Sequence, residues 1–386
     1  MTVNVLQTES ALELGGEEFR VLAEVEGLVQ RGHRVILALR PNSQLQGLAS
    51  AQGVPVETVM MEKWLYPIAI LFLVRLISRY TIDIVHTHGS RDSWIAAIAG
   101  RLSRRKPVII RTRHKSVPIA DNFLNRILYT RLTDRIITTG ERVRQDLIQR
   151  NRFDGSRIVS IPTGVDLGLF RPRPDDGAFR AELGIAPQEF LVGMVSFLRD
   201  YKGYRYYIEA ARLVLEREAM VRFLIVGDGP EQEALRAQID QLGLTDRVIM
   251  TGHREDIPNI LSALDLFVLT SIDAEGLPQV ITQALAMEKP VVASNVGAVS
   301  EVVMHGQTGL LVPPRDPDAM AEQILLLMKD RDLGRRLAYN GRRLVEERYS
   351  LATMLDRVEA LYKGVLAELL VCASLLDWWL EIGAAI

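Results

Sequence analysis

Short apolar runs rich in β-branched residues alternate with longer segments of helical periodicity along almost the whole chain. This pattern predicts an α/β protein whose parallel strands are joined by crossover helices. Six strands are expected in each half: in the first, Val3–Leu6, Arg34–Ala38, Ile82–His86, Val108–Arg111, Arg135–Thr138 and Ile158–Ile161, and in the second, Leu191–Ser196, Arg222–Val226, Val248–Thr251, Leu266–Leu269, Pro290–Ser294 and Gly309–Val312.

The two sets of strands are expected to form two Rossmann-like domains, because 386 residues are too many for one ordinary core. Residues 166–189 contain the run R-P-R-P-D-D-G, show little periodicity and are expected to be a linker. The predicted domains are 1–165 and 190–348, followed by C-terminal helices over 349–386 that pack back on the first domain. Open α/β sheets bind ligands at the carboxyl ends of their strands, so two such sheets are expected to face each other across a cleft.

Cysteine content and hydrophobic runs indicate a cytoplasmic protein. The single cysteine, Cys372, excludes an intramolecular disulfide, and the chain opens directly into an expected strand. The apolar run Trp64–Val74 is shorter than the roughly 20 residues that span a bilayer. Charged residues interrupt the apolar tail after Val365, so no transmembrane helix is expected.

Positive charge is concentrated between Arg101 and Arg157, where fifteen Lys/Arg stand against five Asp/Glu. That segment carries +10 of a total net charge of −2, which leaves −12 for the rest of the chain. It is either a solvated basic face or the binding surface of an anionic partner such as a phosphorylated substrate or an acidic lipid surface. A nucleic-acid partner is not expected, since the segment lacks interleaved aromatic residues.

Glycine and histidine residues mark the strand ends of the first half. Gly15-Gly16 precede a helical run, where free N–H groups favour an anion; the alternative is a tight turn without a ligand. His86 and His88 form a His-x-His pair, but no third ligand with suitable spacing is evident, so no metal site is expected. His114 is either a donor to a substrate hydroxyl or phosphate, or a structural histidine.

Charged residues follow the strands of the second half. Arg199 and Lys202 precede Gly203, an arrangement that suits a diphosphate group. Glu275 follows the strand Leu266–Leu269, and Gln283 lies further along the next helix, so both are expected to line one side of a ligand. Glu275 is alternatively a helix cap. The pair Gly227 and Gly229 lacks the third glycine of a dinucleotide fingerprint.

Taken in order, Gly15-Gly16 and the motifs D-I-V-H-T-H, T-R-H, I-P-T-G-V-D, L-R-D-Y-K-G, V-G-D-G-P and E-G-L-P-Q-V-I-T-Q-A-L-A resemble the retaining glycosyltransferases of family 4, which have the two-domain GT-B fold. The resemblance covers nearly the whole chain, to about Leu370. It implies a nucleotide-diphosphate sugar donor of UDP or GDP type, a glycan or lipid-linked acceptor, a role in cell-envelope polysaccharide or lipopolysaccharide synthesis, and neither metal nor other cofactor. The catalytic residues that it implies are Glu275, His114, Arg199 and Lys202; the donor-binding residues are Gly15, Gly16, Gly229, Arg254, Gly276, Leu277 and Gln283.

Four positions depart from the family pattern. Glu288 replaces a common glycine and Thr163 a common asparagine, and the other two departures concern the donor site. Gln283 stands where the family usually has Glu, and an amide accepts from the donor ribose with its oxygen alone. Phe197 stands where many relatives have Arg. These departures leave two alternatives open: a non-catalytic nucleotide-sugar-binding protein of the same fold, or a nucleotide-sugar epimerase.

The first half is the expected acceptor side, and its basic segment together with Trp64–Val74 suits an enzyme that is peripheral at the inner face of the plasma membrane. The alternative for Trp64–Val74 is an ordinary buried helix. Trp378-Trp379 in the tail either meet the membrane interface or pack on the first domain.

Overall fold

The computed structural model describes residues 1–114, 119–273 and 275–385, with side chains described as far as residue 370. The chain forms two compact units. The first unit consists of Met1–Pro162 and Ala352–Ile386, and the second of Thr163–Leu351.

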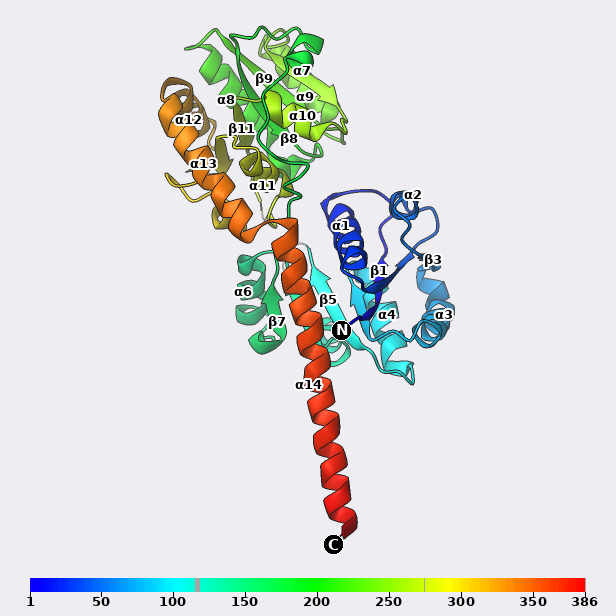
Figure 1. Ribbon diagram of the computed structural model, residues 1–386. Helices are drawn as coiled ribbons and strands as arrows, with labels where there is room; N and C mark the ends of the chain where they lie inside the picture. Colours follow the sequence, from blue (N-terminus) through cyan, green and yellow to red (C-terminus); the bar gives the residue numbers. More distant parts are fainter. Residues whose placement is uncertain (115–118, 274, 386) are drawn as a thin grey trace. The chain divides into compact units, whose positions relative to one another are not determined.

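A seven-stranded parallel sheet with strand order β3-β2-β1-β4-β5-β6-β7 forms the centre of the first unit (Figure 1). Its buried side includes Leu6, Val85, Ile109 and Ile136. The strands are β1 (Asn4–Glu9), β2 (Arg34–Leu39), β3 (Val56–Thr58), β4 (Ile84–Thr87), β5 (Val108–Arg113), β6 (Arg135–Thr138) and β7 (Ile158–Ser160). The helices are α1 (Gly16–Gln30), α2 (Gln44–Ala51), η1 (Lys63–Leu65), α3 (Tyr66–Arg79), α4 (Ser90–Leu102), α5 (Phe123–Ile127), the π-helical turn η2 (Leu128–Leu132), α6 (Glu141–Gln149) and η3 (Gly155–Arg157).

The second unit has a six-stranded parallel sheet with strand order β10-β9-β8-β11-β12-β13. The strands are β8 (Phe190–Val195), β9 (Val221–Val226), β10 (Val248–Gly252), β11 (Leu266–Leu269), β12 (Val291–Ser294) and β13 (Leu310–Val312). The helices are α7 (Ala178–Glu182), η4 (Asp200–Lys202), α8 (Tyr204–Leu215), α9 (Gln232–Gln241), α10 (Ile257–Ala263), α11 (Gln279–Ala286), η5 (Val299–Glu301), α12 (Pro317–Lys329) and α13 (Arg331–Arg348).

Both sheets are doubly wound, as the sequence predicts. All twelve expected strands are present, with ends that differ by up to three residues from the predicted ones. The strand β3 was missed, because its three residues V-E-T form no apolar run. The winding direction reverses at β1, which lies between β2 and β4, and at β8, which lies between β9 and β11. Ligands of such folds bind at these switch points, outside the carboxyl ends of the strands.

Helix α14 (Leu351–Ala385) is a single long helix, drawn in red in Figure 1. It packs on the first unit at Gly27 of α1, where an added Cβ would lie 2.2 Å from Leu355 Cδ1. Arg31 pairs with Asp356 at 2.7 Å and with Glu359 at 3.0 Å. The absence of a side chain at Gly27 therefore permits close packing of the two helices. The predictions for Cys372, Trp378 and Trp379 fall outside the described side chains.

The run Trp64–Val74 forms η1 and most of α3, and only one of its faces is buried. Ala69 and Leu73 lie in the core, whereas Trp64, Ile68 and Leu71 are 79%, 63% and 58% exposed. The helix is therefore buried on one face, as the alternative of an ordinary buried helix predicts, but its other face is exposed. Within the described residues, no helix combines the length and hydrophobicity that crossing a membrane requires.

Candidate donor site and strand-end residues

Lys202 and Glu275 meet at the switch point of the second unit. Lys202 ends η4, which follows β8, and Glu275 follows β11, the neighbouring strand. Lys202 Nζ donates to Glu275 Oε1 at 2.5 Å, and Ser271 Oγ donates to the same oxygen at 2.6 Å. The two charged side chains are only 12% and 10% exposed. The structure thus brings together a cation and a carboxylate that the sequence places 73 residues apart.

Gly203 holds the Lys202 segment against the end of β11. Its φ of +71° is in the left-handed region, and an added Cβ would lie 2.1 Å from the carbonyl oxygen of Thr270. The Thr270 hydroxyl donates to the carbonyl oxygen of Gly203 at 3.0 Å. Only glycine satisfies both the backbone angle and this close approach.

Gly297 supports Glu275 from the loop after β12, and sequence reasoning missed it. Its φ is +54°, and an added Cβ would lie 2.0 Å from the carbonyl oxygen of Glu275. The next residue, Ala298, donates its N–H to that oxygen at 3.1 Å. The available signal was a glycine three residues after a strand end, in A-S-N-V-G.

Gly229 packs against the segment that carries Arg199. The N–H of Leu198 donates to Asp228 O at 2.7 Å, and a Cβ on Gly229 would lie 2.5 Å from the carbonyl oxygen of Leu198. Arg199 is exposed, and its guanidinium carbon lies 5.0 Å from the centre of the Phe197 ring. The phenylalanine that departs from the family pattern therefore contacts the Arg199 side chain by a cation–π interaction.

Gln283 and the residues after Glu275 lie on or next to α11. Helix α11 begins at Gln279 with Pro278 as its N-cap, so Glu275 lies outside the helix. Gln283 is half-buried within α11, and Leu277 is buried. Gly276 connects Glu275 to Leu277. The positions of these residues are established; their roles in donor binding stay predictions.

Arg254 forms hydrogen bonds with two carboxylates of the second unit. Its guanidinium bonds to Asp256 at 2.8 and 2.9 Å and to Glu182 of α7 at 2.5 Å. The hydrogen bonds from Asp256 and Glu182 raise the pKa of Arg254 above its usual range. These bonds join α7 to the start of α10, and the donor-binding role of Arg254 stays a prediction.

Gly15 is the N-cap of α1 and Gly16 is its first residue. Glu17 and Glu18 follow in the first turn. Carboxylates at a helix N-terminus interact favourably with the helix dipole, and they oppose the approach of a second anion. A phosphate contact of Gly15 and Gly16 stays a prediction.

His114 is half-buried and lies at the end of a chain of buried polar side chains that the sequence did not reveal. Gln7 donates from Nε2 to Glu24 at 2.9 Å and accepts from His88 Nε2 at 3.1 Å. His88 Nδ1 lies 3.0 Å from His114 Nε2. Burial lowers the pKa of His88 well below its usual value, so His88 is neutral. With its Nε2 donating, His88 Nδ1 accepts from His114, which fixes the proton of His114 on Nε2.

Glu24, His86 and His88 each offer a potential metal-ligand atom, and these atoms lie within 4.8 Å of one another. Glu24 is a third potential ligand beside the two histidines, which its position in the sequence did not reveal. However, His86 already bonds Tyr362 at 2.7 Å and Thr112 at 2.6 Å, and Arg20 lies 3.8 Å from Glu24. Burial opposes ionisation of Glu24, yet the charge and hydrogen bond of His86 lower the pKa of Glu24 to about 2. Both ring nitrogens of His86 are therefore engaged in hydrogen bonds, whereas Glu24 Oε2 has no hydrogen-bond partner among the described residues. The absence of a metal stays a prediction.

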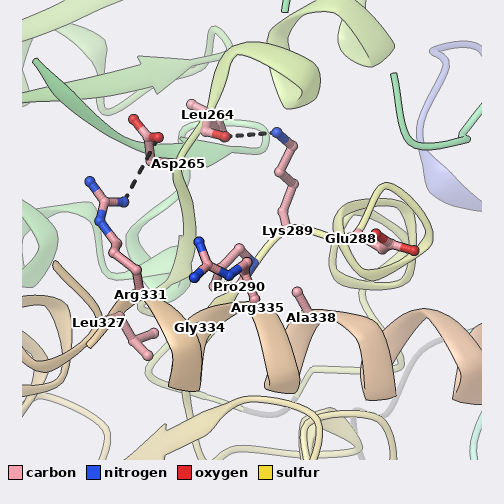
Figure 2. A pocket seen from close by; sticks show the side chains of 10 residues that line it. All are labelled: Leu264, Asp265, Glu288, Lys289, Pro290, Leu327, Arg331, Gly334, Arg335 and Ala338. Atoms are coloured by element: carbon pink, nitrogen blue, oxygen red, sulfur yellow. Dashed lines mark hydrogen bonds and ion pairs between the residues drawn. The ribbon is translucent and has the colours of Figure 1, made fainter. Parts of the chain in front are cut away.

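A cavity of about 210 Å³ lies in the second unit, and Figure 2 shows the side chains that line it. Its lining residues Leu264 and Asp265 precede β11, and Lys289 and Pro290 precede β12, so it lies at the amino ends of these strands. Lys289 Nζ donates to Leu264 O at 2.9 Å, and burial lowers the pKa of Lys289. This cavity is therefore at the opposite edge of the sheet from Lys202 and Glu275.

Two glycosyltransferase family models match the chain, one in each half. Residues 14–169 match the family described as "Glycosyltransferase Family 4", and residues 175–344 match "Glycosyl transferases group 1". An Escherichia coli protein named UDP-Gal:alpha-D-GlcNAc-diphosphoundecaprenol alpha-1,3-galactosyltransferase is 30% identical over 307 residues, which cover 76% of this chain and 78% of that protein.

Two crystal structures show the corresponding fold. Anabaena HepE in complex with UDP-glucose is 25% identical, with a TM-score of 0.83 over 95% of this chain and 99% of HepE. A Rickettsia africae glycosyltransferase has a TM-score of 0.87 at 22% identity, covering 95% of this chain and 99% of that chain. The chain therefore belongs to the retaining family 4 (group 1) glycosyltransferases, enzymes of the GT-B fold that transfer a sugar from a nucleotide-sugar donor.

Proposed function

We propose that the chain transfers a hexose from a UDP- or GDP-sugar to a glycan or lipid-linked acceptor in the synthesis of cell-envelope polysaccharide or lipopolysaccharide. The observation that carries the proposal is the Lys202–Glu275 pair at the switch point of the second unit. An ammonium at this place neutralises the charge that develops on a departing diphosphate. A carboxylate beside it accepts hydrogen bonds from the hydroxyls of the donor sugar.

The proposed chemistry needs no metal ion, because Arg199 and Lys202 supply positive charge. Lys202 is held in place by Glu275, whereas Arg199 lies exposed beside Phe197. We infer that Lys202 is the fixed contact of the diphosphate and that Arg199 adds a second, adjustable one. In the first unit, His114 is the group proposed to contact the transferred sugar.

The relatives support the choice of donor and acceptor. The Escherichia coli relative is named for a UDP-sugar donor and a lipid diphosphate acceptor. A Mycobacterium tuberculosis mannosyltransferase that is 29% identical over 314 residues, 75% of this chain and 78% of that protein, is named as GDP-mannose-dependent. The donor of this chain is accordingly proposed to be of UDP or GDP type.

Thermal unfolding in the presence of nucleotides tests the donor proposal. A ligand present at about 100 times its dissociation constant stabilises the folded state by about 2.7 kcal/mol. We expect UDP or GDP, and its sugar conjugate, to raise the melting temperature, while ADP leaves it unchanged. Lys202→Met is expected to weaken this response. An unchanged melting temperature with every nucleotide would reject the donor site.

Exposed apolar and basic residues of η1 and α3 support a further proposal, that this face contacts an anionic lipid surface. Trp64, Ile68 and Leu71 recur at helical spacing and are all exposed. Between Lys63 and Tyr80 the chain has three basic residues and no acidic one. An apolar stripe flanked by cations suits the interface of an anionic bilayer.

Co-sedimentation with vesicles of phosphatidylglycerol and phosphatidylcholine at low salt tests this surface. The wild-type chain is expected to pellet, and the double variant Ile68→Glu/Leu71→Glu to bind at least about 10-fold more weakly, because each buried apolar side chain contributes about 1.5–3 kcal/mol. Leu326→Glu, a change at a 40% exposed leucine of the second unit, is the matched control. Wild-type protein that stays in the supernatant would contradict the proposal.

A further inference from the structure

A second cavity, of about 170 Å³, lies within the first unit between β5, α4 and η2. The residues that define it are Ser90 and Trp94 of α4, Arg111 and Arg113 of β5, Asn125 of α5 and Tyr129 of η2. We call it the Arg111 cavity. Its volume is several times the roughly 30 Å³ that one water molecule occupies in the liquid.

Arg111 is a buried cation whose hydrogen-bonding capacity is partly unused. The residue is 3% exposed, and its guanidinium carbon lies 4.6 Å from the centre of the Tyr129 ring. Nε and Nη1 of Arg111 have no hydrogen-bond partner among the described residues. A buried charge without hydrogen-bond partners is costly, so it is uncommon unless a ligand completes its surroundings.

Other basic residues of the segment Arg101–Arg157 contrast with Arg111. Arg101 pairs with Asp134 at 2.7 Å, Arg126 with Asp121 at 2.8 Å and Arg144 with Glu141 at 2.9 Å. The excess charge of this segment is therefore not one uniform solvated face. Arg111 instead lines a cavity, and two of its nitrogens find no partner in the part of the chain that the structure describes.

Two further features favour an anion in the Arg111 cavity. Ser90 is the first residue of α4, a helix of 13 residues whose N-terminal N–H groups attract negative charge. Arg113 lies two residues after Arg111 on the same face of β5 and lines the same cavity. Asp92 in the first turn of α4 opposes an anion when it is ionised, but burial raises the pKa of Asp92 and favours its neutral form. Its Oδ2 accepts from the Thr8 hydroxyl at 2.9 Å and from the N–H of His88 at 3.1 Å.

We propose that the Arg111 cavity binds a phosphoryl group of the acceptor, held by the guanidinium of Arg111 and the N-terminus of α4. The proposal rests on the proposed glycosyltransferase function and specifies the acceptor as a phosphate or diphosphate ester. A guanidinium presents paired N–H donors to the oxygens of a phosphate, which an uncharged glycan does not match. Trp94 and Tyr129 provide apolar walls beside the anion.

Calorimetric titration of inorganic pyrophosphate into the full chain, already saturated with UDP, tests the site. UDP occupies the donor site, and GDP replaces it if GDP is the nucleotide that raises the melting temperature, so the remaining binding reports on the Arg111 cavity. Arg111→Gln is expected to weaken pyrophosphate binding by about 10–100-fold, the usual effect of losing charge-assisted hydrogen bonds. Arg150→Gln removes the same charge from a side chain that is 57% exposed, and is expected to change the affinity less than twofold.

The melting temperature of Arg111→Gln distinguishes a ligand site from a structural residue. Because two nitrogens of Arg111 lack partners among the described residues, the variant without ligand is expected to melt at or above the wild-type temperature. A lower melting temperature together with unchanged pyrophosphate affinity would overturn the proposal. If Arg111→Gln does not fold, Arg113→Gln at the half-buried rim replaces it, with an expected loss of at least threefold; unchanged affinity there also overturns the proposal.

Displacement of pyrophosphate identifies the source of the phosphoryl group. Farnesyl diphosphate represents a lipid diphosphate, and glucose 6-phosphate represents a soluble sugar phosphate. Displacement by either compound from wild type, but not from the arginine variant, supports the site and assigns its ligand; displacement by neither overturns it. The initial UDP titration tests the donor proposal separately, since it does not involve Arg111.

Discussion

Lys202→Met is expected to lower the rate of sugar transfer about 10²–10³-fold, which corresponds to the loss of one fixed electrostatic contact to the transition state. The reason is the position of Lys202 Nζ, 2.5 Å from Glu275 Oε1 and almost excluded from water. A cation held there needs no reorganisation when charge develops on the diphosphate. Initial rates with a radiolabelled donor, measured on protein shown to be folded by circular dichroism, give the effect.

Lys329→Met is the matched control, because this lysine is 62% exposed on α12 of the same unit. Its transfer rate is expected to equal that of the wild-type chain. The double change of Arg199 and Lys202 to Ala is expected to cost more than Lys202→Met alone, since both cations serve one group. Turnover of the Lys202 variant within threefold of wild type would refute the assignment of Lys202.

The fold was predictable from the sequence because strand and helix periodicities alternate so regularly. The strands β6 and β11 were predicted to the residue. Strand β11 is an apolar run between Asp265 and Thr270, and β6 is the apolar pair Ile136-Ile137 with the polar residues Arg135 and Thr138 at its ends. The missed strand β3 has the pattern V-E-T, which carries no such signal. Its place in the sheet depends on pairing with Leu37–Leu39 of β2, a tertiary interaction.

Candidate site residues could be named from the sequence where they lie in the segments after strands, and their roles in the reaction stay predictions. Lys202 and Glu275 were identified in this way, because the carboxyl ends of neighbouring parallel strands meet at one edge. Gly297 was not identified, since its contact with Glu275 depends on how the loop after β12 folds back. Likewise, no spacing rule connects Gln7 of β1 and Glu24 of α1 to His88, which lies in the loop after β4.

Gly297→Ala is expected to lower donor-dependent turnover by about 10²-fold, although Gly297 lies outside the charged pair. An added Cβ would lie 2.0 Å from the carbonyl oxygen of Glu275, so the backbone of Glu275 has to move. Displacement of a positioned group by about 1 Å can cost about 10²-fold in rate. Steady-state kinetics with varied donor concentration provide the measurement, together with the free energy of unfolding.

Gly306→Ala separates this displacement from simple backbone strain. Gly306 has a φ of +73°, similar in kind to the +54° of Gly297, but a Cβ added there would have no atom of the described residues within 4 Å. Both variants are therefore expected to lose about 1–2 kcal/mol of folding free energy, because each places an L-residue in the left-handed region. Only Gly297→Ala adds a collision with Glu275. If both variants lose stability but only Gly297→Ala loses turnover, the loop after β12 positions the donor-site carboxylate; equal turnover would mean that the position of Glu275 does not limit the reaction.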